Sequence, residues 1–130
     1  MEVNFTHTDA QTPEPIRIEQ VFAEKPGGGI VANPTFDLPP TTPVAYDSEK
    51  EQFVALVTYD SANKKYVAKT TAGAGGGAAT TDAPEYVTGA WVYANKGDQL
   101  VRLINGANLR KETAVITKEQ AALIPTINLV

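Results

Sequence analysis

Regularly patterned apolar residues begin near Val44 and continue to the end of the chain, whereas the first 43 residues lack such a pattern. Seven of the nine prolines lie in this first part, and prolines remove backbone donors and fix φ. A segment of this composition becomes ordered mainly by lying on another surface. The sequence therefore predicts an extended N-terminal arm over residues 1–43 and a β domain over residues 44–130.

One short piece of the arm, residues 15–24, does alternate between two faces of a strand. One face would carry Ile16, Ile18, Gln20 and Phe22, and the other would carry Arg17, Glu19 and Val21. Such a strand can add to the sheet edge of another protein, or it can pair with an edge of its own body. The sequence favours neither pairing over the other.

From Val44 onward, turn-forming residues recur at intervals of about 8 to 15 residues, which is typical of an all-β sandwich or small barrel. Residues 53–59 are almost continuously apolar, which predicts a central strand covered on both faces, within the body or by a neighbouring subunit. Residues 60–63 suit a turn, and residues 65–69 suit the returning strand of a hairpin. Residues 85–94 are predicted to form a strand that carries the single tryptophan, Trp91.

The last part of the domain contains two short-range motifs. Asn105-Gly106 predicts a tight hairpin, because both residues tolerate the positive φ of a type I′ turn. Thr117 and Gln120 have the spacing of a capping box, which predicts a short helix over residues 118–124. Residues 126–130 then alternate as a closing strand. The expected fold is thus mainly β, a small sandwich or barrel-like domain with one short helix and the N-terminal arm.

The composition narrows the classes of partner. The net charge of −4 and the pI near 4.9 argue against nucleic acid, because phosphate binding needs clustered Lys and Arg. The chain has no cysteine, which excludes disulfides and thiolate metal sites and fits assembly in a reducing cytoplasm. No stretch approaches the roughly 20 apolar residues of a membrane-spanning helix. Neither nucleic acid nor a membrane is an expected partner.

Candidate chemistry is sparse. The only histidine, His7, lies among polar residues of the arm, where a solvated side chain is favoured over a general base. An oxygen-only Ca²⁺ site could draw on Asp47, Glu49, Glu51 and Asp60, but their spacing matches no calcium loop. The Gly-rich residues 70–82, which we expect to form a mobile loop, lack the Lys-Ser/Thr of a phosphate cradle. The sequence therefore predicts no enzyme activity, no metal and no cofactor.

The order of several features carries a resemblance to a known family. These features are the polar arm, Pro26-Gly27-Gly28, the entry at residues 42–47, the strand at 85–94, the Asn105-Gly106 turn, the small helix and the closing residues 126–130. In this layout the chain resembles the lambda-type head decoration proteins of tailed phages. These are small trimeric β proteins that clamp the outside of a DNA-filled capsid.

The resemblance implies a homotrimer at local three-fold axes of the expanded head, on the outer capsid surface of a virion assembled in the host cytoplasm. The expected partner is the major capsid protein, to which each arm would add a strand or across which it would lie. The residues assigned to capsid binding are Ile16, Ile18, Val21 and Phe22, and those assigned to the oligomer interface are Phe53, Leu56 and Trp91. A chain lacking residues 1–25 should then keep a folded body and lose capsid binding.

Two other functions are compatible with the same sequence. A carbohydrate-binding or adhesin-like β module would use the aromatic residues around Trp91, although such residues more often fill a small core or a subunit contact. A structural protein of a phage tail or baseplate would share the β body and the arm but attach to a tube. Electron microscopy of the virion separates a head position from a tail position.

Overall fold

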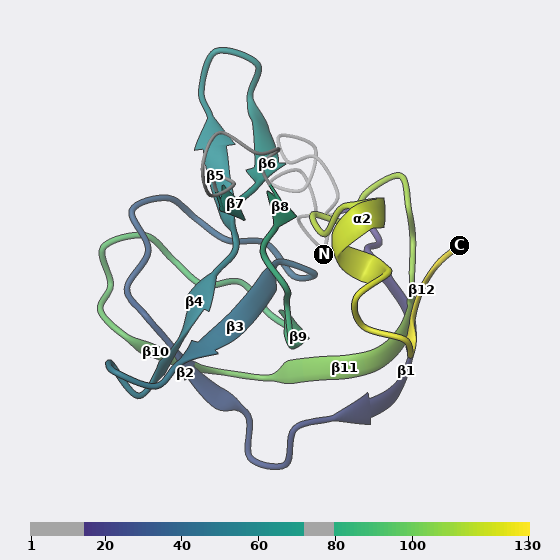
Figure 1. The fold of residues 1–130 in the computed structure, drawn as a ribbon, viewed down its shortest axis with the longest axis horizontal. Helices are drawn as coiled ribbons and strands as arrows, with labels where there is room; N and C mark the ends of the chain where they lie inside the picture. The colour runs from purple at the N-terminus through teal and green to yellow at the C-terminus, as the bar shows by residue number, and fades with distance from the viewer. Residues whose placement is uncertain (1–14, 72–79) are drawn as a thin grey trace, which may run out of the picture.

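The computed structural model describes residues 15–71 and 80–130, and over these residues the protein is mainly β with one short helix, as the sequence predicts. The main sheet has eight strands and curls into a half-barrel (Figure 1). Its strands are β1 (Ile18–Glu24), β2 (Gly29–Val31), β3 (Pro43–Asp47), β4 (Gln52–Ala55), β9 (Tyr86–Thr88), β10 (Gln99–Val101), β11 (Leu103–Leu109) and β12 (Ile127–Leu129).

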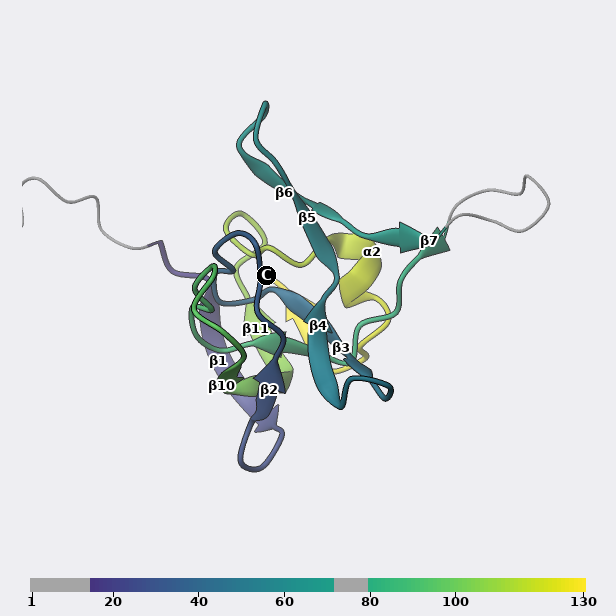
Figure 2. The same ribbon diagram turned by 90° about the vertical axis from the view of Figure 1, so that its left-hand side faces the viewer.

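The strand order in the main sheet is β1-β11-β9-β3-β4-β2-β10, and β12 pairs with β11 in parallel. A hairpin of β5 (Val57–Asp60) and β6 (Lys65–Ala68) projects from the body (Figure 2). The predicted turn and returning strand of this hairpin are confirmed. A two-stranded ribbon of β7 (Thr70–Thr71) and β8 (Thr80–Thr81) follows the hairpin. Residues 72–79 of the predicted mobile loop lie outside the described residues.

The sheet is buried on both faces near its centre. Leu103 and Ile104 are consecutive residues of β11, so their side chains point to opposite faces, and both are fully buried. Leu103 belongs to a first core with Val31, Leu38, Val44, Phe53, Val57, Val92 and Val101. Ile104 belongs to a second core with Val87, Ala107, Leu109, Ile116, Ala121, Ile124 and Ile127. Helix α2 (Lys118–Ala121) covers the second core.

Residues 18–43 differ from the predicted arm, because they are built into the body. β1 pairs with β11, and β2 pairs with both β10 and β4. Val31 and Leu38 are 0% exposed and belong to the first core. Isolated apolar residues between the prolines therefore fill the core although they form no periodic pattern. The predicted boundary between residues 43 and 44 lies inside one folded unit, and residues 1–14 lie outside the described residues.

Of the two pairings left open for residues 15–24, the structure has β1 on an edge of its own body, antiparallel to β11. The register shifts between Ile18 and Gln20 and again between Val21 and Ala23, so that Glu19 and Phe22 are extra residues in β1. The extra residue at Glu19 lies between Ile18 and Val21, so both pack against the second core, although simple alternation places them on opposite faces. The predicted division of faces is therefore wrong at Val21.

Asn105-Gly106 does not form the predicted hairpin. Both residues lie inside the continuous strand β11, and neither is among the residues with positive φ. A Cβ on Gly106 would lie 3.0 Å from the Cβ of Ala23 and 3.3 Å from its backbone nitrogen. Gly106 therefore allows β1 to approach β11 closely, which is a second common use of a strand glycine.

The predicted central strand 53–59 is interrupted at Leu56, which separates β4 from β5. The Leu56 N–H donates to the Pro43 carbonyl at 2.9 Å. Its own carbonyl accepts from the Lys69 N–H at 2.8 Å and from Nε2 of Gln120 at 3.0 Å. One residue thus joins the main sheet, the hairpin and the helix.

The predicted capping box is confirmed. The Thr117 side chain accepts from the Gln120 N–H at 3.2 Å, and the Gln120 side chain accepts from the Thr117 N–H at 3.2 Å. The helix ends at Ala121, before the predicted residue 124. In the predicted strand 85–94, only β9 is a regular strand, and Val92 forms an isolated bridge with Leu38.

Candidate interaction surface

The outer edge of β1 is a candidate interaction surface. β1 ends the strand order of the main sheet and pairs only with β11 among the described residues. An edge strand presents a row of N–H and C=O groups that can pair with another chain. The seven residues of β1 therefore offer a template for strand addition.

Two ion pairs link β1 to the residues that flank β11. Nε of Arg102 donates to Glu24 at 2.5 Å, and Nε of Arg110 donates to Glu19 at 2.6 Å. Both pairs are partly exposed, so their contribution to stability is small. Charged side chains along an edge also discourage unspecific strand pairing.

The four residues assigned to capsid binding separate into two groups. Ile16 is 56% exposed and Phe22 is 54% exposed, so both side chains are available to a partner. Ile18 and Val21 are half-buried and pack against the second core of their own chain. Only Ile16 and Phe22 can therefore contact a partner without disturbing the fold.

The start of the described chain is held in place beside the loop after β11. The Arg110 N–H donates to the Arg17 carbonyl at 2.9 Å, and Oγ1 of Thr113 donates to the Ile16 carbonyl. These bonds fix Ile16 and Arg17 on the loop after β11.

The three residues assigned to the oligomer interface are also divided. Phe53 and Leu56 are buried within the monomer, and Phe53 is part of the first core, so the structure offers neither as a surface contact. Trp91 lies at the surface beside Tyr93, with ring centroids 6.2 Å apart and planes 10° from parallel. The Arg17 guanidinium lies 5.5 Å from the Trp91 ring centroid. We call Trp91 and Tyr93, which stack at the surface, the aromatic pair.

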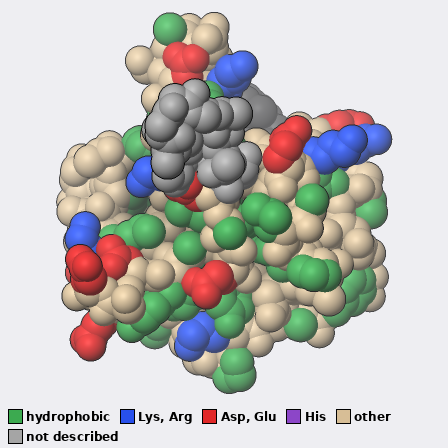
Figure 3. Space-filling view, viewed as in Figure 1, with side chains coloured by type: hydrophobic (Ala, Val, Ile, Leu, Met, Phe, Trp, Pro, Cys, Tyr) green, Lys and Arg blue, Asp and Glu red, His purple; other side chains and the backbone are tan. Residues whose placement is uncertain are grey.

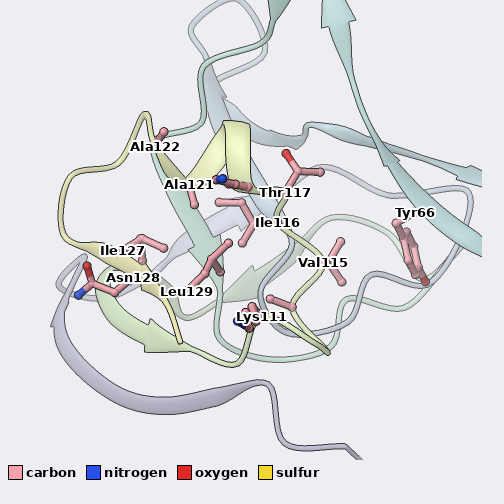
Figure 4. A pocket seen from close by; sticks show the side chains of 12 residues that line it. Tyr66, Lys111, Val115, Ile116, Thr117, Ala121, Ala122, Ile127, Asn128 and Leu129 are labelled. Carbon is pink, nitrogen blue, oxygen red and sulfur yellow. The ribbon is translucent and has the colours of Figure 1, made fainter.

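An open groove of about 910 Å³ lies between helix α2, strand β12 and the segment that precedes the helix (Figure 4). Its lining is mostly apolar, with Val115, Ile116, Ala121 and Leu129 among the contributing residues. Figure 3 shows hydrophobic side chains exposed across the face that carries α2 and β11. Sequence reasoning missed this groove, because the residues that line it run from Tyr66 to Leu129 and meet only in the fold.

The described residues offer little acid–base chemistry. Burial raises the pKa of the Tyr66 hydroxyl, which donates to the Asp37 carbonyl. The side chains of Asp47 and Asp60 each accept backbone N–H groups of their own turns. Within residues 15–71 and 80–130, no group of three His, Cys, Asp or Glu side chains is placed to hold a metal ion. His7 lies outside these residues.

No helix in the described part of the chain has the length and apolar character needed to cross a membrane. Comparisons of the chain with family models, with curated proteins and with solved structures gave no match. Among the surface features that the described residues offer to a partner are the β1 edge with Ile16 and Phe22, the aromatic pair and the groove. All three are suited to non-covalent attachment.

Proposed function

We propose that the protein is a phage head decoration protein that binds the outer surface of the expanded capsid and stabilises it. The order of features in the sequence, which resembles lambda-type decoration proteins, is the basis for naming this partner. The observation that carries the proposal is the open edge of β1, flanked by the exposed side chains of Ile16 and Phe22. Such an edge suits the addition of a strand from a shell protein.

In this proposal the major capsid protein contributes a strand to the β1 edge, and Ile16 and Phe22 occupy apolar depressions on the shell. Backbone hydrogen bonds then supply affinity, and the two side chains supply specificity. Residues 1–14 continue from the same edge and reach the same partner. Attachment follows expansion of the shell, because the expanded shell presents the docking strand.

In this proposal, three copies around a local three-fold axis together bind the shell tightly. Ordering a segment on a partner costs on the order of 1 kcal/mol for each residue fixed, so that a single contact is weak. Linked copies bind with a high effective concentration, which makes the assembly tight without stronger individual contacts. Of the residues first assigned to the trimer contact, Trp91 remains the candidate, together with Tyr93.

The test separates binding from folding with two matched double variants. Ile16→Asp with Phe22→Asp changes exposed side chains and should leave stability within about 0.5 kcal/mol. Ile18→Asp with Val21→Asp buries charge against the second core and should destabilise the fold by several kcal/mol, on the order of 3. Co-sedimentation with expanded, undecorated heads should show at least tenfold weaker binding for the first pair, about 1.4 kcal/mol. Wild-type binding by a folded Ile16→Asp, Phe22→Asp variant rejects the β1 edge as the shell contact.

One observation favours a second function, a carbohydrate-binding or adhesin-like module. The nearly parallel rings of Trp91 and Tyr93 lie at the surface, and Tyr93 is 52% exposed. Aromatic faces combine apolar area with polar edges, which suits sugar rings. Binding to a glycan array that is lost in Tyr93→Ala, with no binding to heads, would support this function over decoration.

A further inference from the structure

One face of the main sheet is covered in β11 and bare in β10. Leu100, Arg102 and Ile104 are alternate residues, so their side chains lie on one face. A Cβ on Gly89 would lie 3.0 Å from side-chain atoms of both Arg102 and Ile104, which agrees with this placement. Ile104 is fully buried in the second core, whereas Leu100 is 69% exposed, more than any other large hydrophobic residue described. The face that is packed at Ile104 is therefore open to water at Leu100.

Leu100 has an exposed apolar neighbour on the adjacent strand. It pairs with Ile30 of β2, whose side chain is 39% exposed. Directly opposed residues of paired strands share a face, so the two side chains lie next to each other. The following residues of the two strands, Val31 and Val101, belong to the first core and hold the strands in this orientation. We call Ile30 and Leu100 the outer pair.

The apolar surface around the outer pair continues onto β4 and β3. Phe53 of β4 points into the first core, so its neighbours Gln52 and Val54 point to the outer face. Val54 pairs with Ala45 of β3, and both are half-buried. Apolar side chains that are contiguous on a sheet face mark a surface that another protein can cover.

Opposite charges flank Leu100 along its strand. Asp98 lies two residues before it, and the Asp98 carboxylate accepts from Nε2 of Gln52 on the outer face. Arg102 lies two residues after it, where a small depression of about 310 Å³ begins. The charged residues that line this depression are Glu24, Lys25 and Arg102, two cations and one anion. One side of Leu100 is therefore acidic, and the other carries an excess of positive charge.

Arg102 keeps the ability to bind a second carboxylate. Its guanidinium pairs with Glu24 of the same copy through Nε and Nη2, and its side chain is 50% exposed. A guanidinium has five N–H donors, so one carboxylate does not use all of them.

The order Asp98, Leu100, Arg102 is complementary to itself when it is reversed. Residues two apart in a strand are separated by roughly 7 Å, so the two charges lie at similar distances on opposite sides of Leu100. A two-fold axis that lies in the contact plane, perpendicular to β10 at Leu100, brings each Asp98 opposite the Arg102 of a second copy. The same axis places Leu100 against Leu100. A second copy of this chain thus matches both the apolar centre and the charges of the surface, as an isologous contact requires.

We propose that two copies of the protein associate face to face through the outer pair, about a two-fold axis that opposes Asp98 of each copy to Arg102 of the other. The aliphatic side chains exclude water from the centre, and the two charge pairs set the antiparallel orientation. The exposed part of the surface is small, so the association is weak and reversible. The contact uses neither the β1 edge nor the aromatic pair, and it does not depend on shell binding.

The first test compares the full chain with two matched variants by sedimentation equilibrium, at concentrations up to about 1 mM, which detect weak contacts. Leu100→Asp places a charge in the centre of the contact, whereas Leu123→Asp makes the same change at a leucine that is 48% exposed beyond helix α2. The wild type and Leu123→Asp should form dimers with equal affinity, and Leu100→Asp should associate at least tenfold more weakly. A wild type that stays monomeric over this range, or equal association of Leu100→Asp and Leu123→Asp, overturns the proposal.

The second test addresses the two-fold arrangement. Leu100→Asp and Leu100→Lys should each associate weakly alone, because like charges meet on the axis, whereas their equimolar mixture should associate at least tenfold more tightly than either variant. A mixture that associates no better than the separate variants rejects the two-fold contact at Leu100.

A third measurement separates self-association from attachment to a shell. If the wild type is monomeric and Leu100→Asp loses co-sedimentation with expanded heads, the outer pair is a shell contact, and self-association is overturned. The sedimentation tests use the protein alone, so failure of shell binding at the β1 edge leaves their outcome unaffected.

Discussion

Thr41 shows how a single residue can hold distant segments together. It is β-branched and fully buried, and it adopts a φ of 79°, which is unusual for such a residue. Its N–H donates to the Thr88 carbonyl at 2.8 Å, and its Oγ1 accepts from the Val115 N–H at 2.9 Å. Its carbonyl accepts from the Ile116 N–H at 3.1 Å. These bonds keep the strained residue in place and connect the proline-rich turn to the segment that leads into the helix.

The glycines between β1 and β2 allow a residue-level prediction with an internal control. Gly27 and Gly28 both have positive φ, but a Cβ on Gly27 would meet nothing within 4 Å, whereas one on Gly28 would lie 2.5 Å from the Val101 carbonyl oxygen. Gly27→Ala should therefore cost about 1 kcal/mol from the backbone alone. Gly28→Ala should cost about 1 to 3 kcal/mol more, because the backbone of β10 must move. Chemical denaturation measures the free energy of unfolding of both variants. Equal losses would show that the close approach of Gly28 to Val101 does not contribute to stability.

At the scale of elements, the β5–β6 hairpin contacts the body mainly through its base. Val57 anchors its base in the first core, and Phe36 lies 6.0 Å from the ring centroid of Tyr66. Further out, Asp60 organises the turn by accepting from the Ala62 and Asn63 N–H groups at 3.1 and 3.2 Å. The tip of the hairpin thus depends on local hydrogen bonds more than on burial.

The charge of Asp60 gives the hairpin a pH dependence. Hydrogen bonds from the Asn63 side chain and backbone lower the pKa of Asp60 below its usual 3.8. A lowered pKa means that the ionised carboxylate stabilises the turn above this pH and that the contribution is lost as pH falls through the folded value. Carboxyl titration by NMR should give a midpoint below 3.8, and Asn63→Ala should raise it. A wild-type midpoint at or above 3.8 would contradict the capping role.

For the whole molecule, β1 is an integral part of the fold, because it pairs with β11 and packs against the second core. The sequence led to the expectation that a chain lacking residues 1–25 keeps a folded body. That truncation removes β1, with Ile18 and Val21, from the second core and uncovers one side of β11. Shell binding and folding are therefore coupled in this truncation, and a shorter one is needed to separate them.

Two truncations compare the residues before β1 with β1 itself. Removal of residues 1–14 leaves every described element in place and should change the free energy of unfolding by no more than about 0.5 kcal/mol. Removal of residues 1–24 should cost about 3 kcal/mol more, because two apolar side chains lose their burial and β11 loses a partner strand. This difference should lower the midpoint temperature of thermal unfolding by roughly a further 10 °C or more. If the two truncations unfolded at the same temperature, β1 would not be part of the cooperative unit.

Local determinants made some elements predictable from the sequence. The Thr117–Gln120 capping box and the turn at residues 60–63 each depend on side chains that bond to backbone within three residues. The candidate site was predictable in part, because the alternating residues 15–24 indicated a strand that could pair with a sheet edge. The sequence did not decide which strand these residues pair with, because the same pattern fits the edge of any sheet.

The sequence by itself determined that the chain is mainly β with one capped helix, because alternation, turn residues and caps act over a few neighbours. Only the tertiary structure decided that Val31 and Leu38 fill the core, that Asn105-Gly106 continues a strand, and that Leu56 divides one apolar run into two strands. Those outcomes depend on contacts between segments far apart in the chain, such as Gly106 against Ala23 and Leu56 against Gln120. Non-local packing overrides local preference where a buried surface needs a particular side chain or a close backbone approach.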